Sequence, residues 1–203
     1  MLHVGLTGNI ATGKSYASRV FTELGAKVID ADHVAHDMLK SGTLAYGGIV
    51  KVFGKAILDE DREIDRKKLA QIIFFDAAKR LKLNSLIHPE VGREILRRIY
   101  ILEQNSKSGI IIVDAALMVE TKSYEMYDRL IVVACDPEIQ VSRLMSRDGL
   151  TETEARARIG SQMPIEEKIK LADYVIETSG TLRQTREQAE KIYRELMRIS
   201  QEA

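Results

Sequence analysis

The sequence has little cysteine, proline or tryptophan: its 203 residues include one cysteine, three prolines and no tryptophan. The single thiol, Cys135, excludes an internal disulfide and a cysteine-rich zinc site, and it is compatible with a reducing compartment. No apolar run approaches the roughly 20 residues that a membrane-spanning helix needs. Residues 1–6 also lack the basic segment of a secretion signal. We therefore expect a cytoplasmic protein.

Net charge is absent as well, because 30 Lys and Arg residues balance 30 Asp and Glu residues. No global field attracts nucleic acid or an anionic membrane, so we expect neither as a partner, and an anionic ligand must be held locally. There is no Pro-rich or Gly/Ser-rich tract, and 45% of the residues are hydrophobic. This composition indicates one main compact domain. We expect no obligatory protein partner.

Short apolar segments alternate with helical patterns along the chain. β-branched runs without polar alternation are typical of strands that helices cover on both faces, and the right-handed crossover between the first two strands makes them parallel. The pattern predicts an α/β fold with a five-stranded parallel sheet. Strands are predicted at residues 2–6, 27–30, 109–113, 129–134 and 174–176, with helices at 14–24, 137–147, 151–163 and 182–199.

The stretch from residue 32 to residue 106 has a helical pattern and no convincing strand, which indicates an inserted helical subdomain. Its helices are predicted at residues 66–75, 79–87 and 90–103. His88-Pro89 interrupts the last two of these patterns, and Pro89 fits the first turn of the helix that continues from Glu90. His88 is a candidate substrate contact, although a core or capping role is commoner.

One segment fits the pattern G-x-x-x-x-G-K-S and lies between a predicted strand and a predicted helix, which is the context that supports such a match. Glycines let the backbone wrap a phosphate chain, and the start of the helix adds its positive dipole end. A glycine-rich turn alone would require neither the lysine nor the hydroxyl. The segment therefore predicts binding of ATP with Mg²⁺, through Gly8, Asn9, Ile10, Ala11, Thr12, Gly13, Lys14 and Ser15.

Two side chains of this segment have specific roles. Lys14 is expected to reach the β- and γ-phosphates, and the Ser15 hydroxyl is expected to be a ligand of Mg²⁺. Asp114 ends the third predicted strand, where an acid can hold the metal through water. A structural aspartate at the end of a strand is the alternative for Asp114.

Asp30 and Asp32 follow the second predicted strand, at the edge of the sheet where ligands of open α/β sheets bind. One carboxylate could accept a proton from an attacking hydroxyl, with Asp32 the preferred base, and the other could hold a Mg²⁺-bound water or the neighbours of the first carboxylate in place. Asp32 could equally cap a helix that starts at His33. The residues alone leave the two interpretations evenly balanced.

Arginines gather on two consecutive predicted helices. Arg143 and Arg147 are four residues apart and share a face, and Arg156 and Arg158 follow on the next helix. The cluster could close over the phosphates of ATP. Ordinary surface pairing with nearby acids, such as Asp148, is the alternative. The remaining histidines show no spacing typical of a zinc site.

Taken together, these segments resemble the dephospho-CoA kinase family over nearly the whole chain. The matching pieces are Gly5-Leu6-Thr7-Gly8 leading into the loop, Asp30-Ala31-Asp32, Leu86-Ile87-His88-Pro89, Val113-Asp114 through Glu120, Arg143-Leu144 with Arg147, Glu154-Ala155 with Arg158-Ile159, Ser161-Gln162-Met163, Lys168 and Ala172-Asp173. The sequence departs from the family at Asn9, where glycine is usual, in residues 114–117, which lack a proline, and at Thr178, where asparagine is usual.

The resemblance implies a P-loop NTPase-type three-layer fold and a transferase that phosphorylates the 3′-hydroxyl of the ribose of dephospho-CoA, the last step of coenzyme A biosynthesis. It implies that Asp32 is the base, that Lys14 and Arg143 are catalytic ligands of the ATP phosphates, and that His88 belongs to the substrate subdomain. The implied division is a nucleotide-binding core of residues 1–31, 107–142 and 171–203, a substrate subdomain of residues 32–106 and a lid of residues 143–170.

Two other functions stay open on the residues alone. The first is a P-loop kinase for another small substrate, such as a nucleoside monophosphate, because the loop does not select the acceptor. The second is a nucleotide-dependent switch or assembly factor. The sequence contains no Asp-x-x-Gly and no Asn-Lys-x-Asp element to support GTP switching.

Overall fold

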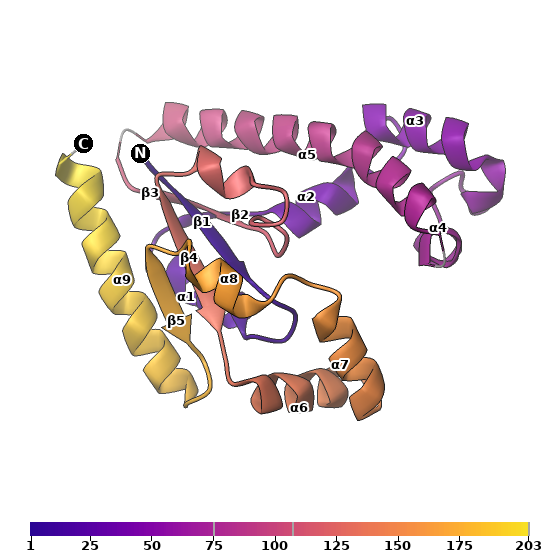
Figure 1. Ribbon diagram of the computed structural model, residues 1–203. Helices are drawn as coiled ribbons and strands as arrows, with labels where there is room; N and C mark the ends of the chain where they lie inside the picture. Colours follow the sequence, from indigo (N-terminus) through magenta and orange to yellow (C-terminus); the bar gives the residue numbers. More distant parts are fainter. Residues whose placement is uncertain (75, 107, 203) are drawn as a thin grey trace. The chain divides into compact units, whose positions relative to one another are not determined.

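The computed structural model describes residues 1–74, 76–106 and 108–202. The chain forms two compact units (Figure 1). The first, which we call the sheet unit, comprises Met1–Asp30 and Ile101–Ala203. The second, the inserted unit, comprises Ala31–Tyr100. No helix in the described ranges is both long and apolar enough to cross a membrane.

The sheet unit is built on five parallel strands in the order β2-β3-β1-β4-β5, which confirms the predicted sheet. β3 lies between β2 and β1 in the sheet, so this apolar strand has a neighbour on each side. The short, half-exposed β2 is at an edge. All five strands therefore end at one edge of the sheet, where the loops after them meet. The strands are β1 (Leu2–Gly8), β2 (Lys27–Asp30), β3 (Ile110–Asp114), β4 (Arg129–Ala134) and β5 (Tyr174–Glu177).

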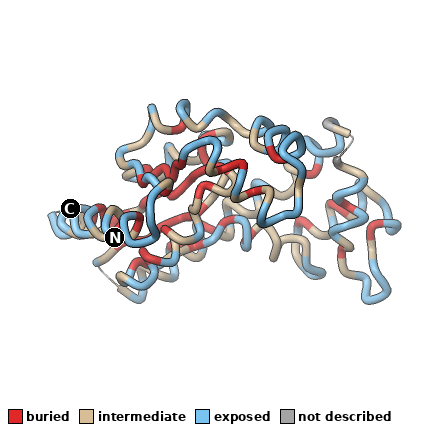
Figure 2. The backbone as a smooth tube through the Cα atoms, turned by 90° about the horizontal axis from the view of Figure 1, so that it is seen from below, coloured by how far each residue is buried: buried red, intermediate tan, exposed pale blue. Residues whose placement is uncertain are grey.

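One face of this sheet packs against α1 (Lys14–Glu23) and α9 (Leu182–Glu202). Buried residues gather along the strands and on the facing sides of the two helices (Figure 2). On the other face the connection between β3 and β4, which includes a 3₁₀ turn at Ser123–Met126, lies close to β1. A Cβ atom on Gly5 would lie 2.5 Å from Met118 Sδ, so glycine is needed for this close packing.

A helical hairpin follows β4. Asp136 caps α6 (Pro137–Asp148), which ends at Gly149 in a left-handed conformation. Thr151 and Glu154 form a capping box at the start of α7 (Glu152–Gly160). The helix predicted for residues 151–163 is too long by three residues at its end, because α7 ends at Gly160. A separate short helix, α8 (Ile165–Ile169), begins after Pro164 and was not predicted.

The inserted unit is helical and has a core of its own, which includes Ile49, Ile57, Leu69 and Leu83. Its described residues contain one isolated antiparallel bridge, between Leu58 and Ile64, and no named strand. Phe75, the last residue of one predicted helix, lies outside the described residues. The helices are α2 (Ala31–Asp37), α3 (Leu44–Phe53), the 3₁₀ turn Lys55–Ile57, α4 (Arg66–Phe74) and α5 (Ala77–Asn105), which continues into the sheet unit.

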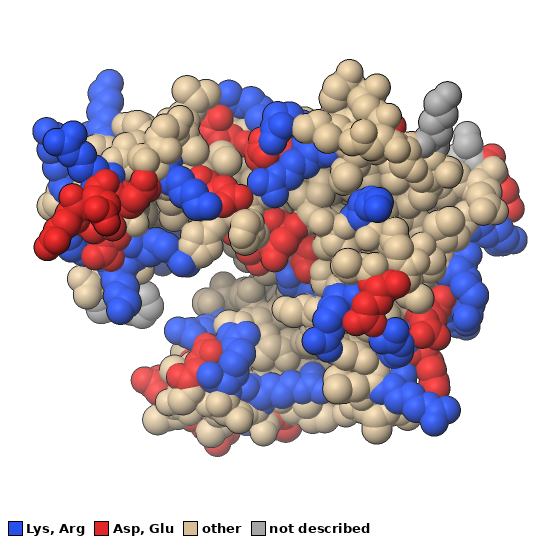
Figure 3. Space-filling model, turned by 180° about the vertical axis from the view of Figure 1, so that it is seen from behind, with Lys and Arg blue, Asp and Glu red and all other residues tan. Residues whose placement is uncertain are grey.

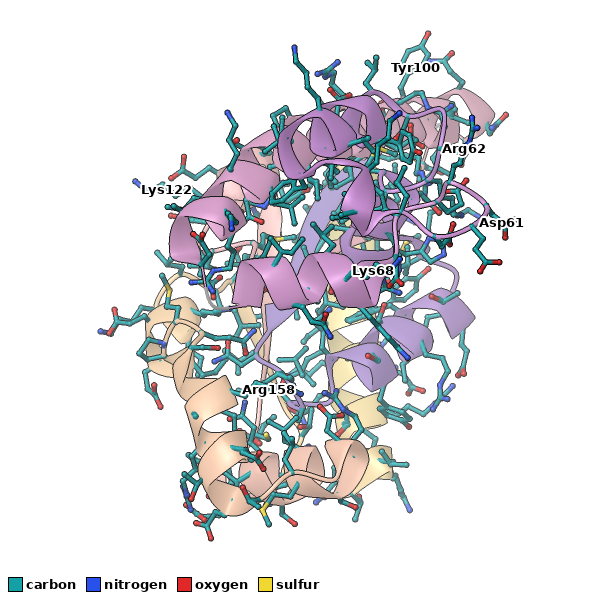
Figure 4. All side chains as sticks on the ribbon, turned by 90° about the vertical axis from the view of Figure 1, so that its right-hand side faces the viewer. Asp61, Arg62, Lys68, Tyr100, Lys122 and Arg158 are labelled. Carbon is teal, nitrogen blue, oxygen red and sulfur yellow. The ribbon has the colours of Figure 1, made fainter. Side chains whose placement is uncertain are left out.

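A tight turn closes the Leu58–Ile64 bridge. Figure 4 shows Asp61 and Arg62 on this turn and Lys68 on α4, the helix that follows. Arg62 has a positive φ of 64°. The Lys68 ammonium donates a hydrogen bond of 2.7 Å to the carbonyl of Leu58, so α4 is tied back to the start of the turn.

The prediction of two helices separated at His88-Pro89 is wrong. α5 runs without a break from residue 77 to residue 105, with Pro89 inside it. A proline inside a helix removes one backbone hydrogen bond and crowds the carbonyl four residues earlier, at Ser85. Buried residues on both sides of the proline, Leu83 and Ile95, hold the two halves in one helix through their packing.

Within the inserted unit, the carboxylate of Glu94 joins a charged network between α5 and α2. Arg97 Nε donates to it at 2.7 Å and Arg98 Nε at 2.8 Å. Arg98 also donates to Asp37 on α2, at 3.3 Å. The hydrogen bond from Arg97, together with the one from Arg98, lowers the pKa of Glu94 from 4.5 to about 2.

A depressed carboxyl pKa stabilises the fold above the unfolded-state value, and the contribution is lost as pH falls from about 4.5 to about 2. We predict that Glu94→Gln lowers the free energy of unfolding by about 1 kcal/mol at pH 7, and by progressively less toward pH 2. Urea unfolding across this pH range measures the difference. Glu60→Gln, at an exposed position of the same unit, is the control for loss of charge. A deficit that stays constant with pH would contradict the prediction.

Candidate functional site

The loop between β1 and α1 turns sharply enough to point backbone groups inward. Two of its residues have a positive φ, Ala11 at 61° and Gly13 at 89°. Gly13 is the N-cap of α1, whose first turn carries no acidic side chain that would compete for its amides. Alternation of right- and left-handed residues before a helix makes a concave site for anions. The predicted strand–loop–helix context of this segment is thus present.

Gly8, the first glycine of the loop, is required by close packing. A Cβ atom there would lie 2.5 Å from the carbonyl oxygen of Val133 on β4 and 2.9 Å from the Thr12 hydroxyl. That hydroxyl donates to the carbonyl of Asn9 at 2.8 Å and helps close the loop. The glycine therefore lets β4 and the loop approach each other.

Lys14, the first residue of α1, pairs with Asp114, the last residue of β3. The two side chains are 15% and 6% exposed, so the ion pair is largely shielded from water. The β2–β3 register places Asp30 opposite Asp114 at the same edge of the sheet. Two carboxylate-bearing strand ends and the loop lysine thus meet at this edge.

Arg143 on α6 bonds to Thr178, which follows β5. Its guanidinium donates to the Thr178 hydroxyl at 3.0 Å and to the Thr178 carbonyl at 2.7 Å. The same hydroxyl donates to the carbonyl of Thr12 at 2.5 Å. Thr178 therefore links Arg143 to the loop of residues 8–15, which we call the phosphate loop. A polar residue after a predicted strand is the only sequence signal for this link.

The other arginines of the predicted cluster form surface ion pairs. Arg147 and Arg158 both bind Asp148, at 2.7 and 2.6 Å. Hydrogen bonding to Arg147 lowers the pKa of the Asp148 carboxyl. Arg156 binds Glu152 and Glu138, at 2.8 and 2.7 Å. Lys and Arg atoms mingle with Asp and Glu atoms over α6 and α7 (Figure 3). Such exposed pairs contribute little free energy, so they leave Arg147 able to exchange partners.

Asp32 and His88 belong to the inserted unit. Asp32 is the second residue of α2, so the alternative in which it caps a helix starting at His33 is wrong. His88 is exposed on α5. Asp30, at the end of β2, precedes Asp32 by two residues in the sequence and belongs to the sheet unit.

The donor chemistry of the sheet unit fits Mg²⁺. Ser15 offers an exposed hydroxyl one residue after Lys14, and Asp114 offers a buried carboxylate. Mg²⁺ prefers oxygen ligands and keeps several waters, so it is usually held by one or two protein groups together with phosphate oxygens. Among the described residues no three His, Cys, Asp or Glu side chains cluster as a metal site.

No role was predicted for Gln140 or Gln162, although both side chains bond to Ile10 in the loop. Gln140 is 4% exposed on α6, between residues that face the core. Gln162 lies between α7 and α8. A polar residue within the buried stripe of an amphipathic helix is the signal that could have identified Gln140.

Comparison with known proteins shows the family to which this chain is similar. A family model described as dephospho-CoA kinase matches residues 2–184. The dephospho-CoA kinase of Carboxydothermus hydrogenoformans is 49% identical over 187 residues, which cover 91% of this chain and 89% of that protein. The dephospho-CoA kinase of Bacillus cereus (strain ATCC 10987 / NRS 248) is 46% identical over 191 residues, covering 93% and 94%. The solved dephospho-CoA kinase from Campylobacter jejuni matches with a TM-score of 0.67 and 31% identity over 97% of each chain, which confirms the predicted P-loop kinase fold.

We predict that Gly8→Ala weakens ATP binding and destabilises the protein by about 1–3 kcal/mol, because either the Val133 backbone or the loop must move. Gly47→Ala is the matched control, since its Cβ would meet nothing within 4 Å on α3. Thermal unfolding and calorimetric titration with ATP measure both effects. Wild-type affinity in Gly8→Ala would show that the loop tolerates the displacement.

Proposed function

The chain belongs to the dephospho-CoA kinase family, and we propose that it transfers the γ-phosphoryl group of ATP to the 3′-hydroxyl of the ribose of dephospho-CoA. The products are CoA and ADP. The observation that carries the proposal is the loop lysine, Lys14, shielded from water at the start of α1 and paired with Asp114. A kinase of this type needs a positive charge at that point, beside backbone amides that face the phosphates.

Lys14 and the backbone of residues 8–15 bind the phosphates of ATP in this proposal. Ser15 would hold Mg²⁺ directly and Asp114 would hold it through water, and the metal would neutralise phosphate charge. Because the Lys14–Asp114 pair is shielded, a phosphate oxygen that replaces the carboxylate meets a lysine already in position. The residues mainly position and neutralise, as phosphoryl transfer requires little covalent participation by the protein.

Asp32 accepts the proton of the ribose hydroxyl, and His88 contacts the substrate. The position of Asp32 in the first turn of α2 supports this role, because the side chain is exposed and lies on a regular helix. We assign the inserted unit to dephospho-CoA and residues 143–170 to a lid over the nucleotide. Exclusion of water by the lid favours transfer to the ribose over hydrolysis.

Arg143 and Arg147 bind the phosphates of ATP from the lid. The bonds from Arg143 to Thr178 support this assignment, because Thr178 also bonds the loop at Thr12. Arg147 is engaged only in an exposed pair among its described contacts, which is weak enough to be exchanged for a phosphate. We place the protein in the cytoplasm, where the single buried thiol of Cys135 stays reduced.

A P-loop kinase for another acceptor is the alternative, and a nucleotide-dependent switch is the alternative outside enzymes. A panel of dephospho-CoA, a nucleoside monophosphate and a hydroxy acid, assayed by ATP consumption with the purified chain, separates the three. Dephospho-CoA should be preferred by a wide margin in kcat/KM. ATP consumption that needs a partner protein would favour the switch.

We predict that Asp32→Asn lowers kcat by about 10²- to 10⁴-fold and leaves the KM for ATP nearly unchanged, because the amide cannot take the proton. Steady-state kinetics with both substrates measures this split. Asp61→Asn, on the exposed turn of the same unit, is the control. Full activity in Asp32→Asn removes this residue from the role of base.

Lys14→Ala should raise the KM for ATP roughly tenfold or more and lower kcat as well, because the ammonium contacts phosphates in both the ground and transition states. Lys27→Ala removes a lysine at the start of β2, at the edge of the sheet opposite the loop. It should leave both the KM for ATP and kcat unchanged. An unaltered KM for ATP in Lys14→Ala would contradict the assigned role.

A further inference from the structure

The phosphate loop is held by two buried or half-buried glutamines at one residue, Ile10. Gln140 Nε2 donates to the carbonyl of Ile10 at 2.7 Å, and the amide of Ile10 donates to Gln162 Oε1 at 2.8 Å. A carbonyl can only accept and an amide can only donate, so the orientation of both glutamine side chains is fixed by their partners. We infer that Gln140 and Gln162 are positioning residues that hold Ile10 from two sides and set the loop for ATP.

Gln140 acts on the peptide that links Ile10 to Ala11. In a trans peptide the carbonyl of one residue and the amide of the next point in opposite directions. When Gln140 binds the Ile10 carbonyl, the Ala11 amide is therefore turned away from α6. Ala11 has a φ of 61°, which costs about 1 kcal/mol for a residue with a Cβ atom, so this peptide needs outside support.

Apolar packing supports the same part of the loop. Ile10 and Ala11 pack against a small cluster on the α6–α7 hairpin that is made of Val141, Leu144 and Ala155. The glutamines therefore act on a loop that is already seated on the hairpin. The apolar contacts restrict its distance from the hairpin, and the hydrogen bonds restrict the rotation of its peptides.

The segment that carries Gln162 is itself anchored. The Asn9 amide group donates to the carbonyl of Met163 at 2.9 Å, and the backbone amide of Met163 donates to Glu120 at 3.4 Å. Glu120 pairs at 2.8 Å with Lys168, whose side chain is fully buried and also donates to the carbonyl of Ala116. Because a buried ammonium is costly without its partners, this arrangement fixes α8 and the preceding segment against the connection between β3 and β4.

The inference rests on the proposed function, since it concerns how the loop receives ATP. It adds that α6 and the segment after α7 contribute to nucleotide binding through the backbone of Ile10, in addition to the arginines of α6. Loss of either glutamine should therefore weaken ATP binding, while the affinity for the acceptor, which we assign to the inserted unit, stays the same.

The first test uses Gln140→Met, Gln162→Met and the double variant in the full-length protein. ATP and ADP affinity are measured by calorimetry without acceptor, and both KM values by steady-state kinetics. Each single change should raise the KM for ATP about fivefold to tenfold and leave the KM for dephospho-CoA unchanged. The double variant should raise the KM for ATP by less than the product of the two single increases, because both glutamines act on Ile10. Gln104→Met, exposed near the end of α5, is the control and should resemble wild type.

The second test uses the direction of the hydrogen bonds. Glutamate at position 162 can still accept from the Ile10 amide, whereas glutamate at position 140 cannot donate to the Ile10 carbonyl. Both variants add one negative charge beside Ile10, so repulsion of the ATP phosphates should weaken binding in both of them. Gln140→Glu should therefore bind ATP several-fold more weakly than Gln162→Glu.

A KM for ATP within twofold of wild type in both Met variants overturns the inference. An equal rise in the KM for ATP and the KM for dephospho-CoA also overturns it. So does an equal loss of ATP affinity in the two Glu variants. A lowered thermal stability with unchanged ATP and ADP affinity assigns the glutamines a structural role only, and this also overturns it. If the wild type binds ATP and does not phosphorylate dephospho-CoA, the proposed function fails while the calorimetric comparison still decides the role of the glutamines.

Discussion

The backbone of the phosphate loop must keep a conformation that its own residues do not favour. Gly13 adopts its positive φ at little cost, but Ala11 does so with a Cβ atom in place. The loop is therefore held from several directions: by β4 against Gly8, by Thr178 at Thr12, and by two glutamines at Ile10. Most of the sheet unit can be understood as the support that this loop needs.

Charges in the sheet unit are divided between shielded and exposed positions, with different consequences. Lys14–Asp114 and Lys168–Glu120 are shielded from water, so removal of one partner leaves an uncompensated charge and is costly. The pairs of Arg147, Arg156 and Arg158 on the hairpin are exposed and contribute little. Shielded pairs thus fix geometry near the loop, while the hairpin arginines are held by exposed pairs that are easily exchanged.

The sequence was sufficient for features that depend on local pattern. The five strands, α1, the end of β3 at Asp114 and the motif of residues 8–15 follow from β-branched runs, glycines and helical spacing. Two helix boundaries were wrong because tertiary packing keeps α5 continuous through Pro89, and because Pro164 begins a separate helix after α7. The bonds of Gln140, Gln162 and Thr178 to the loop join residues more than 100 positions apart. A local pattern can mark Gln140 as a buried polar residue, but it cannot identify the partner of any of the three.

The central claim is that the loop delivers the γ-phosphoryl group of ATP to one hydroxyl of dephospho-CoA. The most direct measurement follows ATP whose three terminal γ-phosphate oxygens are labelled with ¹⁸O, in a reaction with purified protein and dephospho-CoA, by mass spectrometry of the products. We expect CoA with a new phosphate at the ribose 3′ position that retains all three labelled oxygens. Labelled inorganic phosphate with unchanged dephospho-CoA would contradict it.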